Sequence, residues 1–159
     1  MRPTKQLILG FREAASRLRD YNVKYAWDKP CNCNCGILAQ AILGLTGDQL
    51  FERYQPCGTW SSYAEYNMRM CADTGIPHDE LFKILQEAGL ELGDYNLIEY
   101  VGGIKLCSDR EYVAVQFDQW ADELERKRRN ETNKVTHPRT KGDRKETTGS
   151  QHQIQLVDA

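Results

Sequence analysis

The segment Ile37-Leu38-Ala39-Gln40-Ala41-Ile42-Leu43 constrains the fold more than any other part of this chain. Apolar side chains cover nearly every face of a helix formed by this segment, and such a helix is stable only in the middle of a core. Asn34 is the expected N-cap and Gly44 the expected stop. We therefore predict a mainly α fold, a compact bundle of about six helices packed around this buried central helix.

Amphipathic segments on either side of the central helix supply the first and the last of the other helices. The first is predicted to begin after Thr4, its N-cap, and to run to about Asp20, and the last from about Asp109 to Arg129. Apolar residues recur in both at steps of four, three and four. They are Leu7, Phe11, Ala14 and Leu18 in the first helix, and Val113, Phe117, Trp120 and Leu124 in the last. We expect both helices to pack against the central one.

Residues 22–27 show a different period. Val23, Tyr25 and Trp27 alternate with other side chains in this segment, and a period of two is typical of a strand. Residues 104–107 are the other short candidate for a strand. The sequence therefore allows at most a minor two-stranded patch beside the helices.

The C-terminal part of the chain differs in composition from the rest. Residues 1–125 contain 12 Lys and Arg against 19 Asp and Glu, whereas residues 126–159 contain 9 against 4. Too few large apolar side chains follow Asn130 to order that segment by burial. We predict a helical domain over residues 1–130 and a polar, basic-leaning tail over residues 131–159, which is disordered or is ordered by a partner.

The densest positive charge is the run Arg126-Lys127-Arg128-Arg129. A basic segment of this kind can bind an acidic protein partner. The alternative is that residues 126–145 bind nucleic acid. A further alternative is a solvated helix end, where the macrodipole favours cations. The aromatic side chains that would stack on bases lie in the acidic body and not in this segment. We therefore favour another protein or an assembly as the partner over nucleic acid or a small molecule.

Three alternate cysteines, Cys31, Cys33 and Cys35, precede the central helix. In an extended loop alternate side chains point the same way, and converging thiolates suit Zn²⁺ or Cu(I). Cys57 is the predicted fourth ligand, with His78 as a further candidate, so the sequence predicts a structural metal site with zinc as the candidate ion. The one-residue spacing is tighter than the usual zinc spacing. The alternative is that these thiols pack as small apolar side chains.

Cys35 is also a candidate nucleophile, because the N-terminal end of a helix lowers the pKa of a thiol. The run Cys35-Gly36-Ile37-Leu38-Ala39 resembles the nucleophile helix of papain-like hydrolases, especially the bacteriocin-processing peptidases. This resemblance implies a histidine general base, but Glu111 precedes the segment 112–115 that would match the strand carrying it. His78 is the only histidine in the body of the chain. The alternative function is therefore a cysteine-dependent hydrolase with Cys35 as nucleophile and His78 as base.

The sequence shows no familiar catalytic or nucleotide-binding motif, and its other features favour an interaction protein. The sequence contains no P-loop, GxGxxG or HExxH motif. Trp60 and Tyr63 are the predicted aromatic contact patch for a partner. No apolar run is long enough for a transmembrane helix, and the N-terminus lacks the apolar stretch of a secretory signal. We expect a small cytoplasmic accessory or interaction protein.

Overall fold

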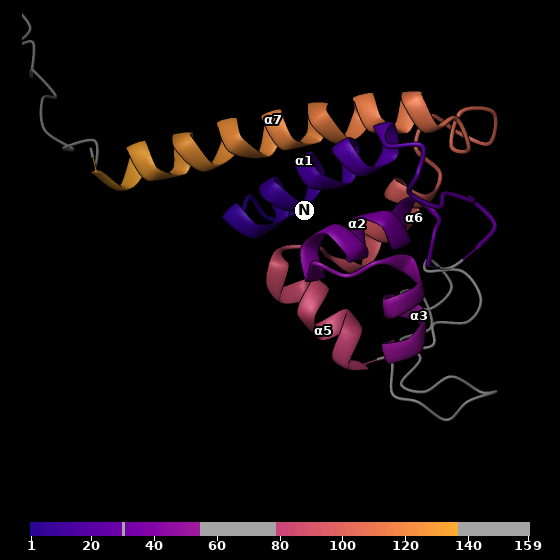
Figure 1. Cartoon of the computed structure of the whole chain (residues 1–159). Helices are drawn as coiled ribbons and strands as arrows, with labels where there is room; N and C mark the ends of the chain where they lie inside the picture. The colour runs from indigo at the N-terminus through magenta and orange to yellow at the C-terminus, as the bar shows by residue number, and fades with distance from the viewer. Residues whose placement is uncertain (30, 55–78, 137–159) are drawn as a thin grey trace, which may run out of the picture.

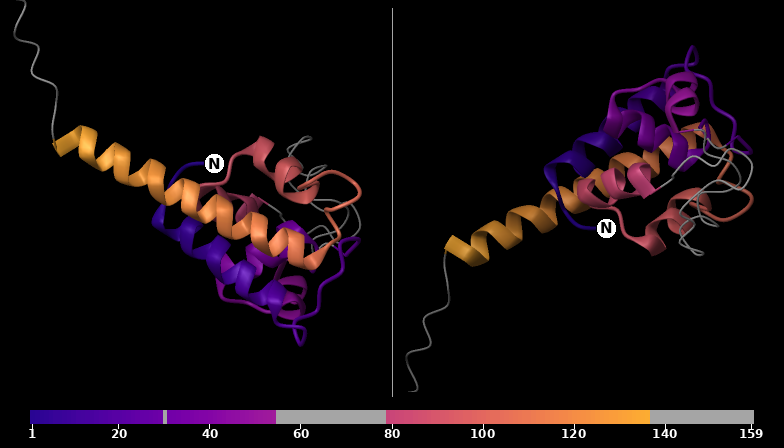
Figure 2. Two further views of the ribbon diagram at one scale, coloured as in Figure 1. Left: turned by 90° about the horizontal axis from the view of Figure 1, so that it is seen from above. Right: turned by 90° about the horizontal axis from the view of Figure 1, so that it is seen from below.

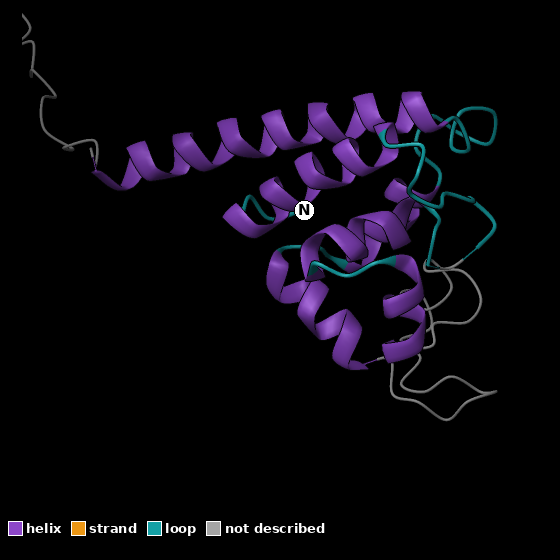
Figure 3. Ribbon diagram, in the orientation of Figure 1, coloured by secondary structure: helices purple, strands orange, loops and turns teal. Residues whose placement is uncertain are grey.

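The fold is all-helical within residues 1–29, 31–54 and 79–136, the ranges that a computed structural model describes. Figure 3 shows no strand in these ranges, so the prediction of a mainly α fold is confirmed. Six helices follow one another there: α1 (Lys5–Arg19), α2 (Asn34–Leu43), α3 (Gly47–Tyr54), α5 (Asp79–Ala88), α6 (Leu92–Glu99) and α7 (Arg110–Thr136).

The first and last helices pack side by side in antiparallel directions (Figures 1 and 2). Thr4 caps α1 as predicted, since its hydroxyl oxygen accepts a hydrogen bond of 3.0 Å from the Leu7 N–H. The apolar stripes of both helices meet around Phe11, whose ring contacts Phe117 edge-on at 5.2 Å and Trp120 at 5.6 Å between centroids. The stripes read from the sequence therefore form the interface between α1 and α7.

Arg110, the first residue of α7, joins that helix to the C-terminal end of α1. Its guanidinium donates hydrogen bonds to four backbone carbonyl oxygens, those of Arg17, Leu18, Asp20 and Val23. It also lies over the Tyr21 ring at 4.9 Å and faces the Tyr25 ring at 5.7 Å from the centroid. The last carbonyl groups of a helix lack hydrogen-bond partners within that helix. The Arg110 guanidinium supplies donors to these carbonyl oxygens at the end of α1.

The central position predicted for α2 is found in the structure. This helix is buried from Asn34 to Gln40 and contacts α1, α3, α5 and α6. Gly10 lets α1 approach α2 closely, because a Cβ atom at Gly10 would lie 2.6 Å from Cγ1 of Ile42. Gly44 ends α2 with a φ of 68°, which confirms the predicted stop. The last helix, however, lies against α1 and not chiefly against α2.

The predicted two-stranded patch is wrong. Residues 22–27 and 104–107 lie in loops and turns, and Tyr25 and Trp27 instead direct their side chains to groups of the helical core. The Tyr25 hydroxyl donates to the Asn34 side chain at 2.8 Å, and Trp27 Nε1 donates to the Glu99 carbonyl oxygen at 2.9 Å. The alternation in the sequence therefore reflects two inward-facing aromatic residues and not a ladder of paired strands.

The long helix α7 continues to Thr136, beyond its predicted end near Arg129. Its C-terminal part projects past α1 and away from the other helices (Figures 1 and 2). Residues 137–159 lie outside the described ranges, and the division into a domain over residues 1–130 and a tail over residues 131–159 stays a prediction. Among the described helices, none combines the length and the apolarity that crossing a lipid bilayer requires.

Candidate functional site

The cysteine-rich loop and α2 enclose a buried polar centre at Asn34. Its side-chain amide nitrogen donates to three backbone carbonyl oxygens: Ile98 at 3.2 Å, Glu99 at 3.0 Å and Cys107 at 2.9 Å. Its side-chain oxygen accepts the hydroxyl hydrogen bond from Tyr25. Asn34 was predicted as the N-cap of α2, but Cys33 holds that position. The amide of Asn34 is instead used to join α2 to the end of α6 and to the loop before α7.

Glu99 is the ionisable member of this centre. Only 4% of its surface is exposed, and burial raises the pKa of its carboxyl group. Hydrogen bonds from the thiols of Cys35 and Cys33 and from the Cys35 backbone N–H act in the opposite direction. One carboxyl oxygen, Oε2, is buried with no hydrogen-bond partner in the described ranges. We refer to Tyr25, Cys33, Asn34, Cys35 and Glu99 as the Asn34 cluster.

The two thiols of the cluster share the Glu99 carboxyl as a partner but differ in their contacts with the backbone. Cys33 Sγ accepts a hydrogen bond of 3.4 Å from the Gly36 N–H, whereas Cys35 Sγ donates to the Tyr95 carbonyl oxygen at 3.4 Å. Cys33 and Cys35 do not lie in an extended loop, because the chain turns before Cys33 and Cys35 lies in the first turn of α2. Both thiols nevertheless approach the Glu99 carboxyl.

Protonated thiols are the favoured form at this end of α2. Burial raises the pKa of Cys31 to about 12, and it raises the pKa values of Cys33 and Cys35 well above the usual range. The nearby Glu99 carboxyl adds to the shift at both Cys33 and Cys35. Desolvation therefore outweighs the helix N-terminus, which on its own would favour the thiolate.

The nucleophile hypothesis depends on the Cys35 thiol and on a base beside it. A hydrolase needs a thiolate and a neighbouring base, and Cys35 is buried with its thiol donating to a carbonyl oxygen. His78, the predicted base, lies outside the described residues. The hydrolase function stays a prediction.

Of the predicted metal ligands, only Cys31, Cys33 and Cys35 lie in the described part of the chain. No group of three or more His, Cys, Asp or Glu side chains there has an arrangement that holds a metal ion. Cys31, Cys33, Cys35 and Cys107 form no disulfide among the described residues, and all four are buried. Cys57 lies outside the described residues, so a zinc site that includes it stays a prediction.

The basic segment, residues 126–129, lies on the part of α7 that projects from the other helices (Figure 1). All four side chains are exposed, and none forms a hydrogen bond or ion pair with a described residue. Two neighbouring acids on α7 pair with another helix, since Arg12 of α1 lies 3.0 Å from Asp122 and 2.8 Å from Glu125. Trp60 and Tyr63, the predicted aromatic patch, lie outside the described residues.

Glu99 and the true role of Asn34 were missed in the sequence. An asparagine before an apolar helix is the usual sign of an N-cap, and no local pattern shows that its partners lie 64 to 73 residues away. For Glu99, the only signal was a single acid between Ile98 and Val101, which are both apolar. Such an acid at the end of a short helix reads as a solvated position.

Comparison of the chain with protein-family models, with curated protein sequences and with solved structures gives no match. The class that the fold defines is that of a small all-helical domain with a projecting terminal helix.

Proposed function

We propose that this chain is a small cytoplasmic interaction protein that docks on an acidic surface of a protein partner through the basic segment of α7. The observation that carries the proposal is the exposure of four consecutive cations without a described ionic partner, on a helix that projects from the other helices. Buried free thiols fit the reducing conditions of the cytoplasm.

The position of the basic segment within α7 supports docking over a purely local role. The attraction between cations and a helix macrodipole is confined to the last turn. Because α7 ends at Thr136, residues 126–129 lie about two turns before that end. The macrodipole therefore does not explain why four cations gather there.

A protein partner fits better than nucleic acid. The body of the chain carries an excess of acids over residues 1–125, which repels a long polyanion that extends beyond α7. Phe11 and Phe117 pack against each other in the core, and the described aromatic residues that are exposed, Tyr21, Phe51 and Tyr100, all belong to the acidic body. No aromatic side chain occurs between residues 125 and 136 to stack on a base.

The proposal is tested with a variant of the full chain that lacks the four charges of the basic segment. The substitutions are Arg126→Gln, Lys127→Gln, Arg128→Gln and Arg129→Gln. Binding of a short fluorescent oligoglutamate peptide is measured by anisotropy at low and at physiological ionic strength. We expect affinity at low salt to fall about tenfold, since exposed charge pairs are each worth a few tenths of a kcal/mol. The matched control replaces four exposed lysines of the body, Lys5, Lys29, Lys83 and Lys105, by Gln.

The two variants carry the same change in net charge, so only position distinguishes them. Equal loss of binding in both would show that net charge, and not the basic segment, governs association. A single-stranded oligonucleotide is titrated in parallel. Tighter, strongly salt-dependent binding of the oligonucleotide through residues 126–129 would replace the protein partner by nucleic acid.

A further inference from the structure

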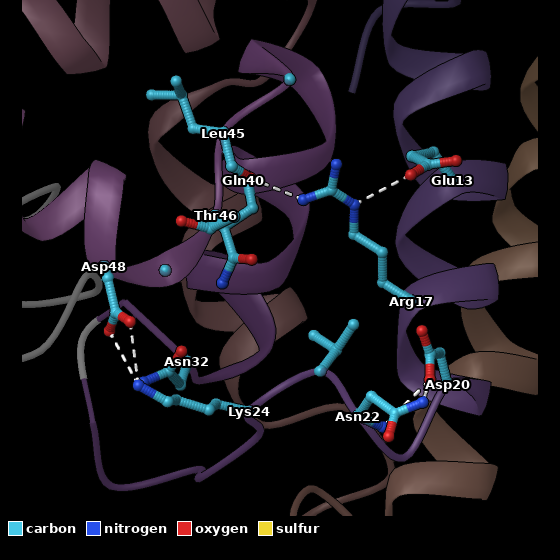
Figure 4. Close-up of a pocket in the computed structure, with 13 residues that line it drawn as sticks. Glu13, Arg17, Asp20, Asn22, Lys24, Asn32, Gln40, Leu45, Thr46 and Asp48 are labelled. Atoms are coloured by element: carbon cyan, nitrogen blue, oxygen red, sulfur yellow. Dashed lines mark hydrogen bonds and ion pairs between the residues drawn. The ribbon is translucent and has the colours of Figure 1, made fainter.

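The hollow between α1 and the start of α3 (Figure 4) is the larger feature of the surface, but its charges already pair with one another. Arg17 donates to Glu13 at 2.9 Å, and Lys24 donates to Asp48 at 2.9 Å. The charges of the projecting part of α7 have no such partners among the described residues. This part of α7 therefore indicates more about a ligand than the hollow does.

The helix α7 is longer than its antiparallel partner α1 and continues past the start of that helix (Figures 1 and 2). Arg110, the first residue of α7, donates to carbonyl oxygens at the end of α1. Since α1 has 15 residues and both helices have the same rise per residue, the start of α1 lies beside about residue 125 of α7. The stretch of α7 that continues past α1 therefore begins at the basic segment, residues 126–129.

The charge along one edge of α7 changes sign at the point where α1 begins. Asp118, Asp122 and Glu125 lie 2.7, 3.0 and 2.8 Å from arginines of α1. These acids follow one another at steps of four and three, so they lie on one edge of the helix. The next position on that edge, four residues after Glu125, is Arg129. Acids thus line the edge where α1 lies beside it, and a cation follows beyond α1.

The apolar stripe of α7 ends at the same level. Phe117 and Leu124 are buried on the side that faces α1. The next position on that side, four residues after Leu124, is Arg128, which is exposed. Arg126 comes two residues after Leu124, about 200° around the helix. Arg128 and Arg129 therefore face the line along which α1 would continue, whereas Arg126 faces away from it.

We propose that an acidic helix of the protein partner docks on α7 in line with α1, and that Arg128 and Arg129 bind its carboxylates. This inference rests on the proposed function of the basic segment and names the side of α7 that is used. Charge complementarity identifies the occupant. Within the body, acids of α7 pair with arginines of α1, and beyond α1 the sign on α7 is reversed, so a helix in that place must carry acids.

The start of α1 adds to the attraction for carboxylates. Its first turn contains no acid, and Lys5 there is exposed. The N-terminal end of a helix also carries a partial positive charge. Glu131 lies on the docking side of α7, but Lys127 is one turn before it and offsets its charge. The side that would face the partner therefore keeps a net positive charge.

The test compares single substitutions that remove the same charge from different sides of α7. The probe is a fluorescent alanine-based helical peptide with glutamate at every fourth position, and its binding to the full chain is measured by anisotropy at low ionic strength. We expect Arg128→Gln and Arg129→Gln each to weaken binding about threefold, as for the loss of an exposed ion pair. Arg126→Gln is the matched control, and it should leave the affinity unchanged.

A second measurement locates the bound peptide. A nitroxide label is placed at either end of the peptide in turn, and the full chain is labelled with ¹⁵N. We expect one of the two labels to broaden the amide signals of Lys5 and Gln6 at the start of α1. Equal loss of affinity in Arg126→Gln and Arg128→Gln, or no broadening at the start of α1 from either label, would overturn this docking position but not the proposed function. Binding that survives the loss of all four charges would overturn both.

Discussion

Replacing Asn34 by aspartate changes one side-chain NH₂ group to an oxygen and keeps the shape of the residue. In the structure that NH₂ group faces the carbonyl oxygens of Ile98, Glu99 and Cys107, and Asn34 is completely buried. Aspartate would place a carboxylate oxygen against three acceptors, with no cation among its described hydrogen-bond partners. We therefore expect Asn34→Asp to destabilise the fold strongly.

The magnitude follows from the hydrogen bonds that are lost. Two amide N–H groups serve the three carbonyl oxygens of Ile98, Glu99 and Cys107, and a buried group left unpaired costs about 1 to 3 kcal/mol. Taking two such losses gives about 4 kcal/mol, before any cost of burying a carboxylate charge. That is a large fraction of the roughly 5 to 15 kcal/mol that stabilises a typical domain. It corresponds to a fall in melting temperature of about 12 °C.

Urea denaturation followed by circular dichroism at neutral pH measures this loss. Asn96→Asp is the control, because it makes the same chemical change at an exposed position of the neighbouring helix α6, and it should shift the free energy of unfolding by less than about 0.5 kcal/mol. If the two variants lose the same free energy, the convergence of carbonyl oxygens on Asn34 does not stabilise this protein and our reasoning about the Asn34 cluster is wrong.

Three further predictions concern Glu99, Cys35 and Arg110. Because burial raises the pKa of Glu99 in the folded state, the stability from its protonated form is complete below its unfolded pKa and is lost as pH rises through the folded value. Glu99→Gln should therefore stabilise the fold at about pH 8 and change it little at about pH 4; an equal effect at both, by urea denaturation, would contradict this. Cys35 in the folded chain should react with iodoacetamide about a hundredfold more slowly than in urea, by mass spectrometry of its peptide; equal rates would contradict its burial, and a faster rate in the folded chain would favour the hydrolase function. Arg110→Met should lower the free energy of unfolding by about 3 kcal/mol, since four carbonyl oxygens lose a charged donor; comparable loss in Arg126→Met, an exposed residue of the same helix, would refute that role.

The parts of the fold that follow from local periodicity were predictable. The stripes of α1 and α7 repeat within single helices, and residues 37–43 are apolar on every side, so each could be read without knowing its neighbours. Gly44 ended α2 as expected, because a left-handed residue is the common stop of a helix. These features depend on residues a few positions apart.

The candidate site depends on contacts that no local pattern encodes. The partners of Asn34 come from the end of α6 and from the loop before α7, and Arg110 reaches carbonyl oxygens about ninety residues earlier. The extension of α7 beyond Arg129 was missed for another reason. That extension, residues 130–136, contains one apolar residue, Val135, and a helix without an apolar stripe gives no periodic signal.

The pairing of α1 with α7 has a consequence for how this chain is made on the ribosome. Phe11 is synthesised early, yet the rings that cover it, Phe117 and Trp120, emerge only near the end of the described helices. Until then the apolar stripe of α1 lacks its partner from α7, and for part of that time α2 lacks the carbonyl oxygens that bind Asn34. The nascent chain therefore carries uncovered apolar surface for most of its synthesis, which is the state that chaperones bind. The partners of Asn34 emerge before α7, so the covering of the α1 stripe by α7 is the later of the two events.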